Sequence, residues 1–130
     1  MRKKRVYIAG AISGDKNFKI KFGIAERELR EAGHIVLNPA SLPQAVKGKT
    51  YRQYIDDSHK MLIKADAIFM LPGWQTSRGA CLEFLYGWIC GLEILEVNRD
   101  GVIQEAKRGA TYFKSYTGVF SSRGLYVYKG

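Results

Sequence analysis

The sequence predicts a doubly wound, Rossmann-like α/β domain, with a mainly parallel sheet of four to five strands and helices on both faces. Three observations lead to this fold class. Short β-branched or aromatic runs alternate with segments whose apolar residues recur at helical spacing. The order strand–helix–strand–helix–strand–helix–strand implies right-handed crossovers, which place helices on both faces of a parallel sheet. A chain of 130 residues, of which 46% are hydrophobic, suits one such core.

The first two strands and the helix between them lie before Asn38. Residues 5–9 form a β-branched, aromatic strand that stops at Gly10, and a turn-rich loop follows over residues 10–15. The next helix shows apolar residues spaced by four and three positions: Phe18, Phe22, Ala25, Leu29 and Ala32. Gly33 ends this helix, and residues 34–37 form the second strand.

The remainder of the core repeats the pattern. After a loop over residues 38–50, a second helix presents one inward face: Tyr51, Tyr54, Ile55, Ser58, Met61, Leu62 and Ala65. Residues 66–71 form the third strand, which Pro72-Gly73 breaks. A third helix runs from about Arg78 to Gly91, and residues 93–97 form the fourth strand.

The last thirty residues differ from the core. They begin with a turn at residues 98–101, continue with aromatic residues that lack a clear period, and end in a late strand at residues 124–128. We expect an α/β core over residues 1–97 and a C-terminal extension over residues 98–130. Because the aromatic stretch 112–128 is too apolar to stay solvated, we expect it to pack on the core or on a neighbouring subunit of a homo-oligomer.

The net charge of +9 favours an anionic partner. Basic residues cluster only at residues 2–5 and are otherwise spread along the chain, and no nucleic-acid-binding motif is visible. A small phosphorylated ligand therefore explains the charge better than a nucleic-acid polymer does. No apolar run approaches the roughly 18 residues that a membrane span needs, so we expect no membrane partner and a cytoplasmic location.

The sequence predicts neither a metal site nor a cofactor. The two cysteines, Cys81 and Cys90, have no metal-type spacing and are expected to be buried small hydrophobic residues. The loop over residues 10–14 matches neither a dinucleotide fingerprint nor a Walker loop.

The candidate site lies at the carboxyl ends of the strands, where open parallel sheets bind ligands. There the N-terminus of the third helix offers free N–H groups to an anion, with Ser77 as its cap and Gly79 allowing close approach. Glu83 lies in the second turn of that helix among apolar neighbours, where a carboxylate needs a partner or a function. Tyr7 on the first strand could supply the partner.

Other polar residues are weaker candidates. Asp56 and Asp57 lie near the same edge of the sheet and could hold a sugar hydroxyl or pass a proton, although a solvated helix surface explains them too. His34 and Asp66 begin their strands and therefore belong to the opposite edge, in structural roles.

Four segments together resemble a family that is common in phages and prophages: residues 7–14 (YIAGAISG), 33–40 (GHIVLNPA), 65–74 (ADAIFMLPGW) and 77–83 (SRGACLE). This family of unknown function is related to nucleoside 2-deoxyribosyltransferases and 2'-deoxynucleoside 5'-phosphate N-glycosidases. The resemblance spans about residues 5–95, and for a phage-encoded protein it implies the host cytoplasm.

The resemblance implies an N-glycosidase or deoxyribosyltransferase acting on a nucleoside or nucleotide. The residue matching Glu83 attacks the anomeric carbon of the sugar, and the residue matching Tyr7 orients that carboxylate. A 5'-phosphate is held by Ser77, Gly79 and the first loop, to which Gly10, Ile12, Ser13 and Gly14 belong, and Arg78 adds positive charge. Active sites in the relatives are completed by a neighbouring subunit.

One position departs from the relatives. Many of them carry an Asp eight residues before the Asp that opens the third strand, where this chain has Ser58. Asp57 would replace that acid only if the helix register shifts, because one residue turns the side chain by roughly 100°. The departure keeps a second hypothesis open, namely a protein that binds a nucleotide without turnover, such as a phage protein that sequesters a host nucleotide signal. A basic nucleic-acid accessory protein is a third, supported by charge alone.

Overall fold

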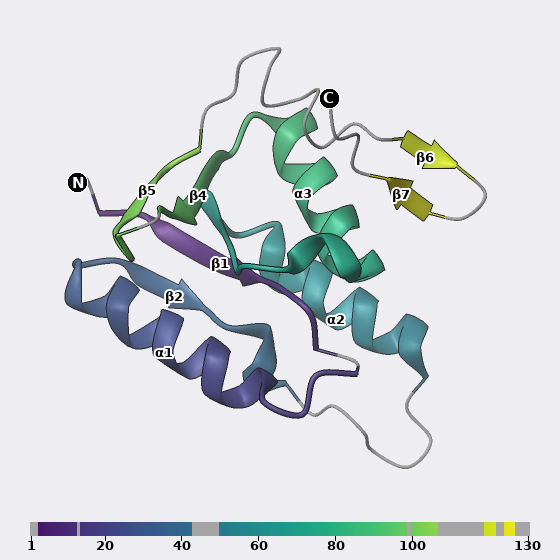
Figure 1. Ribbon diagram of the computed structural model, residues 1–130, viewed down its shortest axis with the longest axis horizontal. Coiled ribbons are helices and arrows are strands. Elements are labelled where there is room, and N and C mark those ends of the chain that lie inside the picture. The colour runs from purple at the N-terminus through teal and green to yellow at the C-terminus, as the bar shows by residue number, and fades with distance from the viewer. Residues whose placement is uncertain are drawn as a thin grey trace.

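The computed structural model describes residues 3–12, 14–42, 50–98 and 100–106, and the backbone of residues 119–121 and 124–126. Its main sheet has five strands in the order β2-β1-β3-β4-β5 (Figure 1). The parallel strands are β1 (Arg5–Ala9), β2 (Ile35–Leu37), β3 (Ala67–Met70) and β4 (Glu93–Val97). The edge strand β5 (Ile103–Glu105) runs antiparallel to β4.

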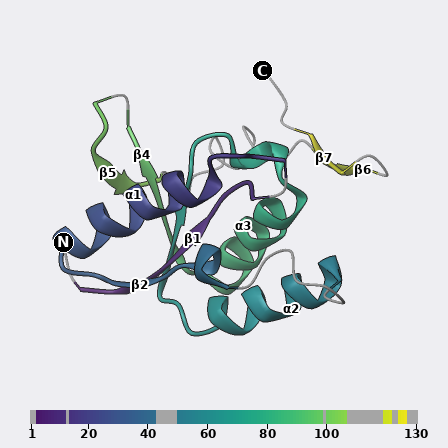
Figure 2. The same ribbon diagram turned by 90° about the horizontal axis from the view of Figure 1, so that it is seen from below.

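Helices cover both faces of this sheet (Figure 2). Helix α1 (Phe18–Glu31) packs on one face, and α2 (Tyr51–Leu62) and α3 (Arg78–Cys90) pack on the other. Two short 3-10 helices, η1 (Pro39–Ser41) and η2 (Trp74–Thr76), follow β2 and β3. The predicted fold class is therefore confirmed.

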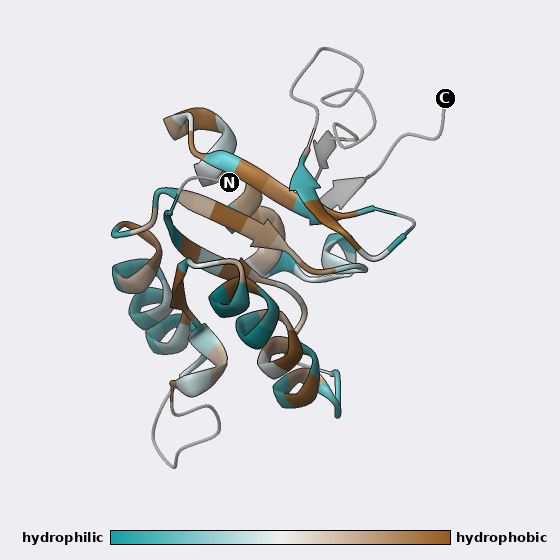
Figure 3. Cartoon of the chain, turned by 90° about the vertical axis from the view of Figure 1, so that its left-hand side faces the viewer, coloured by the Kyte–Doolittle hydropathy of each residue, from teal (hydrophilic) through white to brown (hydrophobic). Residues whose placement is uncertain are grey.

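The central strand β1 shows how the two cores arise. Its side chains alternate between the faces, so that Val6 and Ile8 join the core under α1 while Tyr7 and Ala9 join the core under α2 and α3. All four are fully buried. Figure 3 shows the central strands as largely hydrophobic, as expected for a parallel sheet covered on both sides.

Helices α2 and α3 have well-formed caps. Thr50 forms a capping box with Gln53 at the start of α2. Ser77 caps α3 by accepting a hydrogen bond from the Ala80 N–H at 3.2 Å, as the sequence predicted. Gly91 ends α3 with a φ of +74°, which favours glycine.

The turn after β4 is where the structure adds most to the predicted core. Asn98 Oδ1 accepts hydrogen bonds from the N–H groups of Asp100 and Val102, and this turn leads into β5. The pattern analysis did not predict β5, because a strand of three residues with two exposed polar side chains carries no period-two signal.

The C-terminal segment is described only in part. The late strand expected at residues 124–128 corresponds to β7 (Gly124–Tyr126), which pairs antiparallel with β6 (Val119–Ser121). Most of the aromatic stretch, and the packing expected of it, lies outside the described residues. The division into a core of residues 1–97 and an extension of residues 98–130 stays a prediction.

One burial expectation was wrong. Cys81 is buried as expected, but Cys90 is exposed, because it is the last residue of α3 and lies beyond Gly87, the last buried position of that helix. His34 is satisfied locally, as predicted, since its Nδ1 accepts a hydrogen bond from the Lys4 N–H at 3.1 Å. Among the described residues, no helix combines the length and apolarity that crossing a membrane requires.

Candidate active site

Tyr7 and Glu83 meet between the sheet and α3. Tyr7 lies on β1 between β2 and β3, paired with Leu37 and Ile68, and its ring points toward α3. Its hydroxyl donates a hydrogen bond to Glu83 Oε2. A residue of the central strand thus contacts one that is 76 positions away in the sequence.

Burial dominates the electrostatics of this pair. It raises the pKa of Glu83 from 4.5 to about 8, although the hydrogen bond from Tyr7 opposes the rise. Burial also raises the pKa of Tyr7 far above its usual range, and the Glu83 charge adds to that effect. Tyr7 therefore stays protonated and can donate, while Glu83 holds its proton until the solution becomes mildly alkaline.

The pair borders a small cavity of about 30 Å³ at the carboxyl ends of the strands. Residues from β1, the loop after it, η1, α2 and the start of α3 line it: Tyr7, Gly10, Ile12, Pro39, Tyr54, Ser58, Ser77, Gly79, Ala80 and Glu83. A second cavity of about 90 Å³ lies between α2 and α3 and shares Gly79 and Glu83 with the first. His59 and Tyr86 also line it, with their rings edge to face and centroids 5.2 Å apart.

Two glycines let chain segments come close together at this site. A Cβ at Gly10 would lie 2.8 Å from Leu71 Cδ1, so Gly10 allows the loop after β3 to pass close to the end of β1. A Cβ at Gly79 would lie 3.3 Å from both Ile55 Cδ1 and the Tyr51 hydroxyl. The first turn of α3 therefore lies directly against α2, which brings Ser58 of α2 to the cavity that Glu83 lines.

The structure gathers most of the sequence-predicted site residues around one cavity, namely Tyr7, Gly10, Ile12, Ser77, Gly79 and Glu83. Asp57, Arg78 and Gly14 do not line either cavity beside Glu83. Asp57 is half-buried on α2, and Arg78 and Gly14 are exposed. Ser13 lies outside the described residues.

Sequence reasoning did not assign Tyr54 and Pro39 to the site. Tyr54 lies one helical turn before Ser58, so the inward-face pattern of α2 contained the signal. Pro39 is placed by Asn38, whose side chain accepts from the Ala40 N–H at 2.9 Å and donates to Glu26 Oε1 at 2.9 Å. Within the described residues, no group of three or more His, Cys, Asp or Glu side chains is arranged to hold a metal ion.

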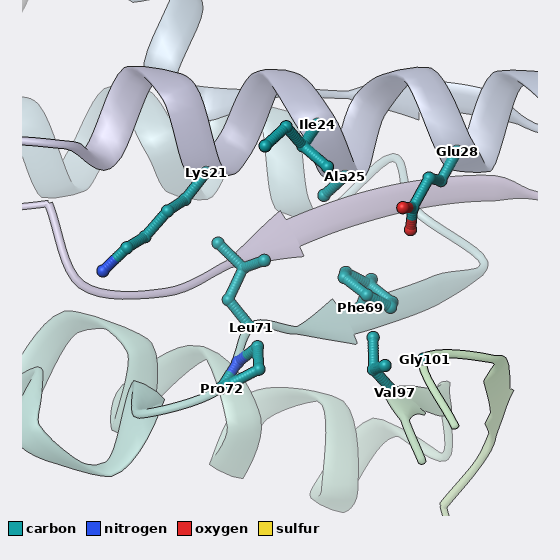
Figure 4. A pocket seen from close by; sticks show the side chains of 9 residues that line it. All are labelled: Lys21, Ile24, Ala25, Glu28, Phe69, Leu71, Pro72, Val97 and Gly101. Carbon is teal, nitrogen blue, oxygen red and sulfur yellow. The ribbon is translucent and has the colours of Figure 1, made fainter. Parts of the chain in front are cut away.

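A larger cavity of about 380 Å³ lies on the opposite face of the sheet, between α1, the ends of β3 and β4, and the turn before β5 (Figure 4). Its lining is mostly apolar, as Phe69, Leu71 and Val97 illustrate. Lys21 at its edge is paired with Asp15 at 2.7 Å. None of the site residues predicted from the sequence lines this cavity.

Residues 4–96 match the family described as Domain of unknown function (DUF4406). The chain belongs to this family. The matched region of the DUF4406 protein contains β1 to β3, all of β4 except Val97, and both residues of the Tyr7–Glu83 pair. No curated protein matches its sequence.

Two solved structures share the fold of the DUF4406 protein. One is a 2-deoxyribosyltransferase from the psychrotolerant bacterium Bacillus psychrosaccharolyticus, with a TM-score of 0.56, 22% identity, and coverage of 72% of this chain and 71% of that one. The other is a conserved protein from Enterococcus faecalis V583, with a TM-score of 0.56 and 14% identity. The match covers 85% of this chain and 70% of that one. At these identities the similarity establishes the fold.

Proposed function

We propose that this protein cleaves or exchanges the bond between the base and the sugar of a nucleoside or nucleotide, with Glu83 as the nucleophile. The observation that carries the proposal is the carboxyl group of the half-buried Glu83, held by Tyr7 beside the N-terminus of α3. A strongly perturbed carboxyl in a cavity at the carboxyl edge of a parallel sheet favours a catalytic role. The shared fold with a 2-deoxyribosyltransferase supports this class of reaction.

The reaction follows from the chemistry of a carboxylate nucleophile. An oxygen of ionised Glu83 forms a bond to the anomeric carbon while the bond from that carbon to the base nitrogen breaks. The base leaves with the electron pair and takes a proton from solvent. Water or a second base then attacks the same carbon, the ester bond to Glu83 breaks, and the carboxylate is restored. Tyr7 donates to the carboxylate and fixes its orientation.

The N-terminus of α3 suits the phosphate of a nucleotide. Ser77 and Gly79 line the cavity at the first turn of the helix, where free N–H groups and the helix dipole attract anions. Arg78 adds an exposed positive charge at the same turn. We assign phosphate binding to this turn and to the first loop.

Release of free base tests the reaction. Wild-type protein is incubated with deoxyribonucleoside and ribonucleoside monophosphates, and free base is measured by chromatography. We expect release by the wild type and none by Glu83→Gln, with nucleotide affinity kept within about tenfold, because the amide retains the shape and loses the attacking charge. Glu28→Gln, an exposed position on α1, is the matched control and should retain activity. Turnover that survives Glu83→Gln would refute the nucleophile assignment.

A nucleotide-binding protein without turnover is the second candidate. It is favoured by Ser58, because a neutral side chain lines the cavity. Many of the relatives that the sequence resembles carry an Asp at this position. In that case the wild type binds a nucleotide and releases no base. Ser77→Ala and Arg78→Ala should then weaken affinity more than Glu83→Gln does, since a hydrogen bond to a charged group contributes about 1.5–3 kcal/mol.

We also propose a homo-oligomer that covers the outer side of α2 and α3. Four large apolar residues in these helices or directly after α2 are between 52% and 71% exposed: Tyr51, Ile63, Leu82 and Ile89. Leu82 also lines the cavity that Glu83 shares, so a second subunit here would cover one side of the site. Light scattering should give a dimer or larger for the wild type and a smaller species for Ile89→Lys. A wild-type monomer at high concentration would contradict the assembly.

A further inference from the structure

The outer side of α1 carries exposed residues that the fold of one chain does not explain. Helix α1 covers the face of the sheet opposite to α2 and α3 (Figure 2). Ile20 and Ile24 lie one turn apart, away from the buried Phe22 and Leu29, and are 63% and 45% exposed. A Cβ at Gly23 would meet no side chain within 4 Å apart from those of its chain neighbours. A glycine inside an exposed helix lowers its stability relative to alanine, so this position is unfavourable for the isolated chain.

The charged residues at the ends of α1 stand in the order that a helix disfavours. Lys16 and Lys19 flank its N-terminus, and Glu31 is its last residue. A helix dipole favours acids at the N-terminus and bases at the C-terminus, so all three oppose it. They are exposed and form no ion pair with any residue that the structure describes. Arg30, the basic residue of the last turn, is paired with Glu26 at 2.9 Å. The two ends of α1 therefore present charges of opposite sign that nothing described in the chain compensates.

We propose that α1 packs antiparallel on α1 of a second copy of this chain, so that a two-fold axis relates the two copies. One side of the helix presents a stripe of exposed residues at three- and four-residue spacing: Lys16, Ile20, Gly23, Ile24, Arg27 and Glu31. A stripe with a basic start, an apolar middle and an acidic end is its own complement when it is reversed. A second copy therefore fits this stripe better than a partner of uniform charge does.

The symmetry determines which residues meet. With the axis beside Gly23 and Ile24, Ile24 of each copy fills the open space over Gly23 of the partner subunit. About two helical turns from this centre, Lys16 of one copy faces Glu31 of the partner subunit, and this pair occurs twice. Each pair compensates charges that oppose the dipole of their own helix. The glycine, the exposed isoleucines and the reversed charges are each unfavourable for one chain, and this contact explains all of them.

This contact differs from the assembly proposed for α2 and α3. It lies on the opposite face of the sheet, and it does not depend on the proposed reaction. One pair of helices buries less area than a standard interface, so we expect a dimer that dissociates on dilution. A chain that makes both contacts forms a particle larger than a dimer, and Ile89→Lys then leaves the α1 dimer.

Sedimentation of Ile89→Lys isolates the contact, because this variant removes the assembly on the other face. We expect its mass to rise from monomer toward dimer between about 10 µM and about 1 mM. Adding Ile24→Lys should leave a monomer throughout, since it places a charge in the apolar centre of the contact on both copies. Val102→Lys is the matched control. Val102 is 56% exposed and lies outside α1, so its substitution should leave the dimer intact.

An exchange of charges tests the antiparallel register. In the Ile89→Lys background, Lys16→Glu and Glu31→Lys each put like charges at both symmetric pairs, and each should weaken association about tenfold. An equimolar mixture of the two should associate within about twofold of the Ile89→Lys protein, because every pair in the mixed dimer again joins opposite charges. Glu105→Lys changes the net charge as Glu31→Lys does, at an exposed position on β5, and should have no effect.

Thermal unfolding of dilute protein separates association from damage to the fold. Lys16→Glu and Glu31→Lys each place the charge that the helix dipole favours, so each Tm should equal or exceed that of the Ile89→Lys protein while association falls. A lowered Tm would instead assign the two charges to the fold of the single chain and would overturn their pairing across the contact.

The outcomes also separate this contact from the other proposals. A monomer for Ile89→Lys at about 1 mM, or association that Ile24→Lys leaves unchanged, would overturn the contact. A mixture that associates no more strongly than either charge variant would overturn it as well. If Ile89→Lys has the mass of the wild type and Ile24→Lys dissociates it, the assembly on α2 and α3 is refuted and the α1 contact is supported.

Discussion

At the scale of single residues, the candidate site is a set of neutral hydroxyl groups around one carboxyl group. Tyr7, Tyr54 and Ser58 line the cavity with Glu83, and burial disfavours the ionised form of both acids in the Tyr7–Glu83 pair. Such an arrangement keeps the carboxyl protonated near neutral pH. The same group becomes a strong nucleophile once it ionises, because little solvent competes for its charge.

The Glu83 pKa makes stability depend on pH. The folded pKa of about 8 lies above the unfolded value of 4.5, so the folded state binds the proton more tightly. The resulting stabilisation is complete below pH 4.5 and is lost as the pH rises through 8. We expect the free energy of unfolding of the wild type, relative to Glu83→Gln, to fall by up to about 5 kcal/mol over this range, measured by urea denaturation.

The comparison with Glu83→Gln isolates this group from the rest of the protein. Burial lowers the pKa of His34 below its usual value of 6.5, so His34 reduces the free energy of unfolding as the pH falls below 6.5. This contribution is the same in both proteins and cancels in the comparison. A difference in unfolding free energy that stays constant from pH 4.5 to 8 would contradict the buried, perturbed carboxyl.

At the scale of elements, α3 carries much of the site and is anchored at both ends. Its N-terminal turn contains Ser77 and Gly79, its second turn contains Glu83, and its last turns pack on β3 and β4 through Gly87. The helix is mostly apolar and is held by burial on the sheet, not by surface charge pairs. Substitutions in the first turns of α3 should therefore affect ligand binding, and substitutions near Gly87 should affect packing on the sheet.

Two substitutions at Ser77 separate the helix cap from phosphate binding. Ser77→Ala removes the bond to the Ala80 N–H and should lower stability by about 1 kcal/mol. Ser77→Asp keeps a good cap and should preserve stability, but its negative charge should repel a nucleotide phosphate. Thermal unfolding measures the stability of the two Ser77 variants, and titration measures their affinity for a nucleotide. Nucleotide affinity that is unchanged in Ser77→Asp would exclude a phosphate at this turn.

Two glycines test the packing of the helices. A Cβ at Gly87 would lie 2.5 Å from Ile68 Cδ1 and 3.2 Å from Ile94 Cδ1, so Gly87→Ala should destabilise the protein by about 1–3 kcal/mol. Gly23 on α1 has no neighbour within 4 Å of its Cβ position. Gly23→Ala should therefore stabilise by up to about 1 kcal/mol. The denaturation midpoints of the two variants measure these changes in stability. Equal changes in Gly87→Ala and Gly23→Ala would show that α3 does not pack closely on the sheet.

At the scale of the whole molecule, β5 ties the segment after residue 97 to the core. It pairs with β4, and Ala106 beyond it is 2% exposed and belongs to the core under α3. A chain that ends at residue 97 would leave β4 as an unprotected edge strand. We expect a chain that ends at residue 106 to fold, and one that ends at residue 97 to be less stable and to aggregate. Denaturation curves and gel filtration compare them, and equal behaviour would make β5 dispensable.

The sequence by itself determined the parallel core and the place of the candidate site. Periodicity and turn residues reveal which side of an element is buried and where it ends, so β1 to β4, the three helices and the Ser77 cap could be predicted. The carboxyl-edge rule then located Tyr7, Gly79 and Glu83 at one end of the sheet.

Only the tertiary structure decided the contacts within that site. The sequence indicated Tyr7 as a partner for Glu83, and the structure shows the hydrogen bond between them. Ser58 reaches the cavity because Gly79 lets α3 lie against α2, and Gly87 lets α3 lie close to β3 and β4. The exposure of Cys90 also became evident only in the structure. The strand β5 forms because β4 offers it an open edge, and its three residues carry no pattern of their own. Local patterns record burial, whereas the partner of a buried group is decided by chain segments far away in the sequence.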